Sequence, residues 1–326
     1  MGLNLTICSK NIKIPEPDAD SLYTSSDEEG ILLKFNEISN DPKFAELEFQ
    51  LGPFQFTHNY YIKGNLNNYA RVSMNYEDVE VAKIHKVISP LIGKDSDGIW
   101  VYIGECLTST SLKDGRGFVV HLVKQYKYQG YFRQGQRNGR GRKITLEKLQ
   151  EGDWLDDEIV GEGKEIHKDG SIYQGKFVNG LYEGLGKIVF ADKSSYSGEF
   201  SKGEKNGYGE YLWNDGSKYV GNWKIGKFSE IGKYLDAHGN IFEGGWKENQ
   251  MDGYGEYTWR DGKKYRGNYY NGKKHGYGEL EWIDGRSWRG NWKLGKMHGK
   301  GQYIVNSKRT NGIWYEGKFI KWQEGF

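Results

Sequence analysis

The chain contains 326 residues, of which 36% are hydrophobic, 47 are Gly and only 5 are Pro. This composition excludes collagen and proline-rich linkers, and the 11 Trp, 24 Tyr and 14 Phe among so many glycines favour short strands joined by tight turns. The formal net charge of +2 is too small to predict a nucleic-acid-binding protein.

Charge is nevertheless distributed unevenly along the chain. Residues 1–99 carry 9 Lys or Arg against 15 Asp or Glu, a net charge of −6. Residues 256–326 carry 15 Lys or Arg against 7 Asp or Glu, a net charge of +8. The sequence therefore has an acidic end and a basic end.

Cysteine usage and hydropathy indicate the compartment. The only cysteines are Cys8 and Cys106, so neither a disulfide framework nor a cysteine-rich zinc site is expected, and a reducing intracellular setting is favoured. No stretch approaches about 18 consecutive apolar residues, and the first residues lack the pattern of a secretory signal. We therefore expect neither a membrane span nor export.

The first residues, MGLNLT, fit the pattern for N-myristoylation at Gly2. Thr6 stands at the position that the pattern requires, and Cys8 is close enough to take a second acyl chain. Two chains would give stable membrane anchoring. A chance match is the alternative.

Residues 1–97 carry no regular repeat. The acidic stretch Pro15–Gly30 predicts a mobile or extended segment, because few of its residues are apolar. Asp41 is suited to cap a helix and Pro42 to occupy its first position, so a short helix is predicted from there.

Strand-like runs follow at 54–62 and 79–88. We interpret residues 1–97 as an N-terminal flap or cap that covers the first edge of the sheet predicted for 98–326, because an unpaired sheet edge promotes association. A separately folded small domain is the alternative.

From residue 98 onward, a pattern of aromatic, any residue, Gly, any residue, aromatic returns at a fixed interval. Its central glycines stand 23 residues apart at Gly175, Gly198, Gly221, Gly244, Gly267 and Gly290. Less regular copies centre on Gly104, Gly130, Gly152 and Gly317. We count ten units, with the irregular ones towards the two ends, as is typical of repeat arrays.

Each unit has a second half that contains Gly-x-Gly and closes with an Asp-Gly turn. Asp215-Gly216, Asp261-Gly262 and Asp284-Gly285 supply the positive-φ positions of a hairpin turn. Each unit is therefore predicted to be strand, turn, strand, turn. A helix is excluded because each interior Gly would destabilise it by about 1 kcal/mol.

Strand periodicity assigns the faces of this sheet. Tyr219, Gly221 and Trp223 share one face, while Val220 and Asn222 occupy the other. We expect a ring from one strand to lie over a glycine of its neighbour. The predicted fold is all-β: an elongated single-layer antiparallel meander of about ten 23-residue β-hairpin repeats, about 95 Å long, with an irregular N-terminal flap.

The units resemble the MORN (membrane occupation and recognition nexus) repeat, which carries Y-x-G-x-W, then N/H-G-x-G, then a D-G turn. The resemblance implies an extended binding platform of hairpins over residues 100 to 326. Two stretches depart from the pattern. Glu230 replaces the first Gly of a pair and the segment 237–239 replaces Asp-Gly, which predicts a bend or bulge. The pattern is also loose over 137–156.

We find no arrangement of residues that predicts catalysis, a cofactor or a metal. Gly139-x-Gly141 and its counterparts lack the helix that follows a phosphate-binding loop. The carboxylates at 156–158 fit an exposed turn, and His275 and His298 share one repeat position. The chain is therefore not expected to be an enzyme.

The expected function is that of a non-enzymatic scaffold for protein–protein interaction in a cytoskeletal assembly. The resemblance adds the setting, since stand-alone arrays of this kind occur in ciliary radial spokes and at the cell cortex. A peripheral membrane protein that binds anionic phospholipid through its basic C-terminal end is the alternative. No nucleic acid is expected as a partner.

Two groups of residues are candidate contacts. The tenth unit lacks room for a complete second strand, which predicts an unpaired edge with exposed aromatic rings that a partner or a second copy of the chain would cover, giving a homodimer. The basic residues would face anionic lipid or an acidic protein. The candidate contacts are Lys293, Lys296, Lys300, Trp314, Phe319, Trp322 and Phe326.

Overall fold

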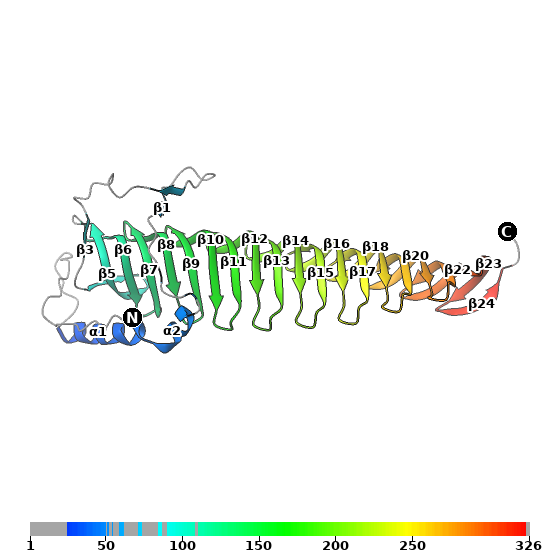
Figure 1. The fold of residues 1–326 in the computed structure, drawn as a ribbon, viewed down its shortest axis with the longest axis horizontal. Coiled ribbons are helices and arrows are strands. Elements are labelled where there is room, and N and C mark those ends of the chain that lie inside the picture. Colours follow the sequence, from blue (N-terminus) through cyan, green and yellow to red (C-terminus); the bar gives the residue numbers. More distant parts are fainter. Residues whose placement is uncertain are drawn as a thin grey trace. The chain divides into compact units, whose positions relative to one another are not determined.

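The computed structural model describes residues 25–49, 51, 54, 59–61, 71–73, 84–86, 90–107 and 110–323 (Figure 1). Its contacts divide the chain into two compact units, unit 1 (Met1–Gly180) and unit 2 (Leu181–Phe326). The boundary between flap and array at 97/98 and the elongation of the whole array stay predictions.

The described residues of unit 1 form two helices and antiparallel sheet. Strands β4 to β11 pair in chain order, β3 also pairs with β5, and β1 pairs with β2. The elements are α1 (Ser25–Ser39), α2 (Pro42–Phe49), β1 (Asn59–Tyr61), β2 (Arg71–Ser73), β3 (Ile84–Lys86), β4 (Leu91–Asp95), β5 (Gly98–Leu107), β6 (Lys113–His121), β7 (Tyr126–Arg133), β8 (Gln136–Ile144), β9 (Lys148–Leu155), β10 (Glu158–His167) and β11 (Ile172–Val178).

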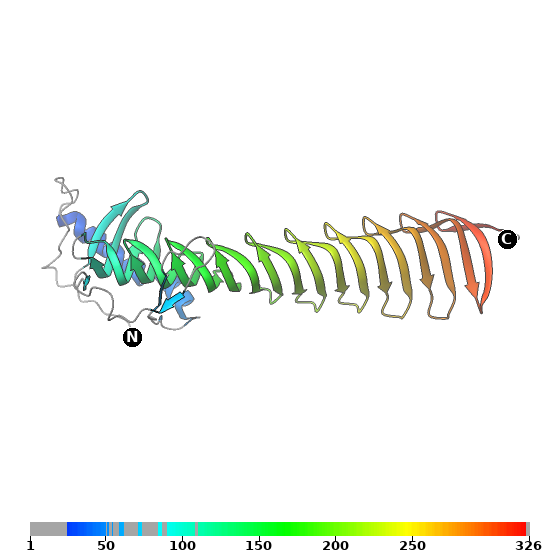
Figure 2. The ribbon, with the colours of Figure 1, turned by 90° about the horizontal axis from the view of Figure 1, so that it is seen from above.

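Unit 2 is a meander in which each strand pairs antiparallel with the next one along the chain (Figure 2). Its strands are β12 (Leu181–Val189), β13 (Ser195–Ser201), β14 (Glu204–Leu212), β15 (Lys218–Lys224), β16 (Lys227–Leu235), β17 (Ile241–Lys247), β18 (Gln250–Thr258), β19 (Lys264–Tyr270), β20 (Lys273–Glu281), β21 (Ser287–Lys293), β22 (Lys296–Val305), β23 (Lys308–Tyr315) and β24 (Lys318–Trp322). The all-β hairpin meander predicted from the sequence is confirmed.

One face of the sheet is built from rings that lie over glycines, and we call it the ring face. In β13 and β14, Gly198 stands opposite Gly209, and the ring of Tyr196 lies over both. A Cβ at Gly209 would stand 2.3 Å from the Tyr196 hydroxyl oxygen, so only Gly fits there. The next ring, Trp223, donates its indole N–H to the Gly209 carbonyl at 3.2 Å. The expected packing of a ring over the glycine of a neighbouring strand is confirmed.

Two kinds of turn join the strands. Gly216 takes a φ of 85° in the Asp-Gly turn, and the Asp215 carboxylate accepts a hydrogen bond from the Ser217 N–H. Only the Gly of this turn needs positive φ. The turns at the opposite ends of the strands have positive φ at two successive residues, such as Leu294 at 49° and Gly295 at 90°, as in a type I′ turn. The sequence predicted a second turn in each unit, but not the residues that form it.

A β-bulge recurs in the repeats, so it is not confined to the repeat in which Glu230 departs from the sequence pattern. The register shifts between Gly198 and Phe200, and again at the equivalent place in four later repeats. Glu230 takes a φ of 55°, in the positive region that Gly253 takes at 87° one repeat later. The prediction of a bulge at Glu230 alone was therefore too narrow, because the second strand of each of these hairpins has two extra residues at this place.

The N-terminal region contributes two helices and three short strands among its described residues before β4. The helix predicted from Pro42 is α2, and the Asp41 carboxylate accepts a hydrogen bond from the Lys43 N–H at 2.9 Å. Strands β3 and β4 pair with β5, the first repeat strand. The run at 54–62 yields only β1, and that at 79–88 only β3, among the described residues.

The extended conformation predicted for Pro15–Gly30 was wrong where the structure describes it, because residues 25–30 belong to α1. Residues 15–24 lie outside the described part. In α1, Ile31, Phe35 and Ile38 follow helical spacing and are buried, so tertiary packing outweighs the acidic start of the segment.

The helices lie on the face opposite the rings, which we call the second face. Phe35 packs edge-on against Phe118, with 6.2 Å between ring centroids. The same cluster includes Val101, Val120 and Ile166, which come from second-face positions of β5, β6 and β10. In unit 1, therefore, the second face is covered.

The centre of the tenth unit was placed wrongly at Gly317. Gly312 is the residue that stands opposite Gly301, and Gly317 lies with a φ of 85° in the turn between β23 and β24. The Trp314 ring packs against Trp288 at 5.4 Å, as Trp292 packs against Tyr265 at 5.1 Å one repeat earlier. The hydrogen-bond register, and not the YEGKF sequence, therefore identifies the centre of this unit.

Candidate functional site

The second face of unit 2 carries a row of exposed apolar side chains. Each residue directly precedes a ring-face glycine, one per repeat, and 23 residues separate each from the next. We call this set the second-face row. It comprises Leu185, Tyr208, Ile231, Tyr254 and Tyr277, whose side chains are between 57% and 74% exposed. Successive members are about 9.6 Å apart, because two strands of about 4.8 Å separate them.

Charged residues beside the second-face row are paired with one another. Arg266 contacts Glu256 at 2.6 Å, and Arg289 contacts Glu279 at 2.7 Å. These pairs bridge adjacent strands on the same face. Each pair joins one positive and one negative charge. The second-face row therefore presents apolar side chains between charged residues that neutralise each other.

The same face in unit 1 shows what such a surface can hold. There the buried Val101, Val120 and Ile166 belong to one hydrophobic cluster with residues of α1 and α2, and Lys127 forms a 2.9 Å ion pair with Glu48 of α2. The repeat architecture therefore accommodates amphipathic helices on its second face. In unit 2, no helix is described, and the row is exposed.

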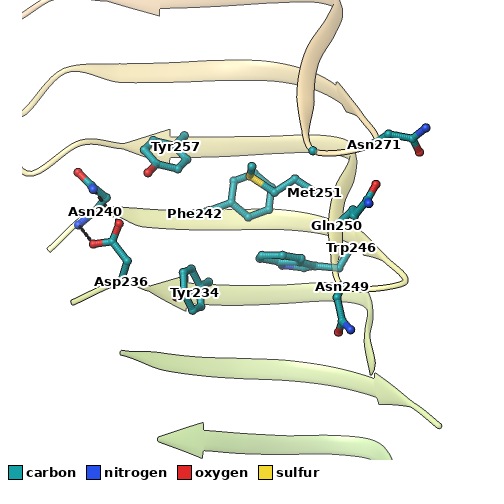
Figure 3. Close-up of a pocket in the computed structure, with 11 residues that line it drawn as sticks. Tyr234, Asp236, Asn240, Phe242, Trp246, Asn249, Gln250, Met251, Tyr257 and Asn271 are labelled. Carbon is teal, nitrogen blue, oxygen red and sulfur yellow. Dashed lines mark hydrogen bonds between the residues drawn. The ribbon is translucent and has the colours of Figure 1, made fainter. Parts of the chain in front are cut away.

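A hollow of about 380 Å³ opens on the ring face around Met251 (Figure 3). Aromatic rings line its middle, and polar side chains stand at its two ends. Its lining includes Tyr234, Asp236, Phe242, Trp246, Met251 and Tyr257. Tyr234 and Trp246 lie edge-to-face with 6.3 Å between their centroids.

A change of residue type explains why the hollow opens there. Asp236 occupies the repeat position that holds Trp213 and Trp259 in the repeats on either side, each 23 residues away. A carboxylate fills much less space than an indole. The other departures in this segment, at 237–239, were noticed in the sequence, but this one was missed although the 23-residue alignment reveals it.

The Asp236 carboxylate is held in place by its own turn. It accepts hydrogen bonds from the Asn240 side chain at 2.7 Å and from the main-chain N–H groups of Asn240 and His238 at 2.9 Å. Burial disfavours its charge, but these bonds outweigh burial and hold the pKa of Asp236 below its usual value. Burial, followed by the charge of Asp236, raises the pKa of Tyr257. The hollow thus combines rings with an ionised carboxylate.

The three predicted basic contacts do not form one cluster. Lys293 and Lys296 are paired across the turn between β21 and β22, whereas Lys300 lies farther along β22 on the second face. All three are exposed, and Lys296 lies 3.9 Å from Glu316. Leu294 at the tip of the same turn is also exposed.

The predicted aromatic contacts are divided between buried and exposed positions. Trp314 is buried, so it belongs to the ring-face core. Phe319 and Trp322 in β24 are exposed, with 4.3 Å between their centroids. Phe326 lies outside the described residues, as do Gly2, Thr6 and Cys8 of the acylation pattern.

Within the described ranges, no group of three or more His, Cys, Asp or Glu is arranged to hold a metal ion. Neither described helix combines the length and apolar character needed to cross a membrane. Cys106 is buried, and burial raises its pKa to about 11, so the thiol is not an activated nucleophile.

The family model for the MORN repeat matches the chain eight times and covers just over half of it. The matched segments are 128–144, 151–172, 173–195, 196–218, 219–241, 242–264, 265–285 and 288–304. No curated protein sequence matches the chain.

Three solved structures show distant likenesses to the chain. One is the TCP domain of SAS-4 from Drosophila melanogaster in complex with a proline-rich motif of Ana2, at 10% identity and a TM-score of 0.30, covering 48% of this chain and 85% of that one. Another is the TCP10 domain of CPAP from Danio rerio, at 12% identity and a TM-score of 0.25, covering 57% and 95%. A third is virginiamycin B lyase from Staphylococcus aureus, at 14% identity and a TM-score of 0.14, covering 70% and 73%.

Proposed function

The chain belongs to the MORN-repeat family, and on that basis we propose that it is a non-enzymatic scaffold which holds partner proteins of a cytoskeletal assembly against its second face. MORN repeats are in general non-catalytic and serve as repeat scaffolds for protein or membrane interaction. The setting that we propose is the cytoplasm, at a ciliary axoneme such as a radial spoke or at the cell cortex.

The second-face row is the observation that carries the proposal. Large apolar side chains that repeat along a face and remain exposed mark interaction surfaces in soluble proteins. Tyr208, Tyr254 and Tyr277 add aromatic character, which is enriched where proteins bind one another. A partner that crosses the strands would meet one such side chain about every 9.6 Å.

The helices of unit 1 indicate the kind of partner surface that fits. Ile31 and Ile38 of α1, seven residues apart, are both buried against the second face there. Seven residues of helix rise about 10.5 Å, close to the spacing of the second-face row. We therefore propose that the partner presents an amphipathic helix with apolar residues at heptad spacing.

The exposed rings of β24 are a secondary contact in this proposal. Phe319 and Trp322 contact each other with tilted rings, and both are about half exposed. A strand or ring of a second copy of the chain could cover them and give a homodimer.

A membrane-binding function is the alternative, and the turns of unit 2 favour it. Ile225 and Leu294 are exposed at turn tips, and lysines flank each of them at 224, 227, 293 and 296. An apolar tip between lysines suits an anionic lipid surface. This edge is separate from the second-face row, so substitutions can distinguish the two functions.

Detergent extraction of cells that express the tagged full chain tests the proposal. We expect the protein to remain with the cytoskeletal residue after membranes are dissolved. Replacing Tyr208, Tyr254 and Tyr277 with Lys should release it, because charge on the row prevents apolar contact. Replacing Lys293 and Lys296 with Glu is the matched control and should leave retention unchanged. Release of the unmodified protein with the lipids, and loss of membrane binding in the Glu variant, would favour the alternative.

A further inference from the structure

One repeat position of the ring face holds a cation in several repeats. Lys205 and Lys274 are separated by 69 residues, which is three periods of 23. The ammonium of Lys205 lies 4.5 Å from the Tyr211 ring and 4.7 Å from the Trp223 ring. Lys113 and Arg137 at the equivalent position of unit 1 also lie over rings, at 4.1 Å from Trp100 and 4.9 Å from Trp154. The ring face is therefore a recurrent binding surface for cations.

The surroundings of Lys274 show how an ammonium is held at this position of the ring face. Its ammonium nitrogen lies 4.6 Å from the Trp259 ring, 4.8 Å from Tyr265 and 4.9 Å from Trp292. Burial and then the like charge of Lys263 lower the pKa of Lys274 to about 8. An ammonium at this position therefore interacts with three rings, but its positive charge is poorly balanced by its surroundings.

One repeat earlier, Met251 takes the place of this lysine, and the hollow of Figure 3 surrounds it. The positions of Trp259 and Tyr265 are taken there by Asp236 and Phe242. The repeat that contains Met251 therefore has an uncharged side chain in place of the ammonium. It also has a carboxylate in place of the ring of Trp259.

The remaining lining completes a partly aromatic site. Tyr234, Trp246 and Tyr257 line the hollow together with Phe242, and Asp236 stands at one end (Figure 3). Tyr269 packs edge-on against Phe242 at 5.1 Å and is buried, and its hydroxyl has no hydrogen-bond partner within the described chain. Rings attract a cation through their faces, and the carboxylate supplies the opposite charge that Lys274 lacks.

We propose that the hollow around Met251 binds an alkylammonium cation from outside the chain, in the place that the Lys274 ammonium occupies in the next repeat. Such a group is found on a free quaternary amine and on a lysine side chain of a partner, methylated or not. The site lies on the ring face and does not depend on the second-face row, so it can fail while the proposed scaffold function holds.

Ligand-observed NMR on the intact chain tests this site with defined probes. The first is choline, compared with 3,3-dimethylbutan-1-ol, which has the same shape without the charge. The second is a short peptide that contains trimethyllysine, compared with the same peptide containing norleucine. We expect the cations to bind with dissociation constants on the order of 1 to 10 mM and the neutral compounds not to bind. Binding of the peptide alone would assign the site to a partner side chain, and binding of choline alone to a free amine.

Three variants locate the binding. Met251→Lys should abolish it, because the tethered ammonium occupies the site, and the precedent of Lys274 indicates that the fold tolerates this change. Met297→Lys alters the equivalent position two repeats later and is the matched control, which should bind as the unmodified chain does. Asp236→Asn should weaken binding roughly fivefold.

Equal binding of choline and its neutral analogue would overturn the proposal, since the hollow would then be only an apolar depression. Undiminished binding by Met251→Lys would also overturn it, because the cation would lie elsewhere. The absence of binding by every cation up to about 50 mM would do the same.

Discussion

The hydroxyl of Tyr219 donates a hydrogen bond to the main-chain carbonyl oxygen of Asn222 at 3.0 Å, within the same strand. This bond fixes the ring over Gly232 of the next strand, where a Cβ would stand 2.3 Å from the hydroxyl oxygen. Tyr196 and Tyr265 make the same bond to Glu199 and Asn268. The ring face is therefore a layer of side chains that are oriented individually.

Replacing Gly232 with Ala should destabilise unit 2 by roughly 2 to 3 kcal/mol, because the added methyl group would clash with the fully buried Tyr219 ring. Gly272→Asn is the control. It stands in open space at a φ of 75°, which Asn tolerates, and should cost under about 1 kcal/mol. Chemical denaturation measures both, and equal losses would contradict the role assigned to the Tyr219 ring.

Tyr219→Phe should cost about 1 kcal/mol, since the Asn222 carbonyl loses a buried partner while the ring remains. The chain already has Phe242 at this repeat position, so the substitution should not alter the fold. Tyr208→Phe on the exposed second face should change the unfolding free energy by no more than a few tenths of a kcal/mol. If the two variants lose the same amount, the hydroxyl bond makes no measurable contribution.

Lys274 should make stability depend on pH. Its pKa of about 8 is below the value near 10.4 expected for an unfolded chain, so between these pH values the unfolded state binds more protons. Unfolding free energy should therefore rise from pH 8 towards pH 10. Lys274→Met should remove this rise and stabilise the protein at pH 7 by roughly 1 to 2 kcal/mol.

The exposed Lys273 is the control for the loss of one positive charge. Lys273→Met should leave stability at pH 7 within about 0.5 kcal/mol of the unmodified protein. Denaturation curves at pH 7, 8 and 9.5 provide the measurement. A rise that persists in Lys274→Met would show that another group causes it.

The fold of the repeats was predictable because the spacing of glycines and rings determines which residues share a face of the sheet. The 23-residue interval fixes where each glycine stands, and a ring two residues before Gly198 must share its face. The same logic failed at Gly317, where a chance aromatic pattern falls on a turn. Only the hydrogen-bond register shows that Gly312 takes the central position.

The candidate sites were less predictable, since each depends on a difference between repeats. Tyr254 stands out only when its exposure is compared with the helix-covered second face of unit 1. Asp236 becomes informative only beside Trp259, whose ring contacts the Lys274 ammonium. Helix α1 was missed because its buried Phe35 is stabilised by contacts distant in sequence, which local composition does not reveal.

Site-specific photo-crosslinking of the full chain in cells is the most direct test of the second face as a partner-binding surface. A photoreactive residue at position 254 should give one protein adduct, and the same residue at the exposed turn position 261 should not. The adduct should disappear when Tyr208 and Tyr277 are changed to Lys. An absence of protein adducts at 254, with lipid adducts at the turn position 294, would contradict the scaffold function and support membrane binding.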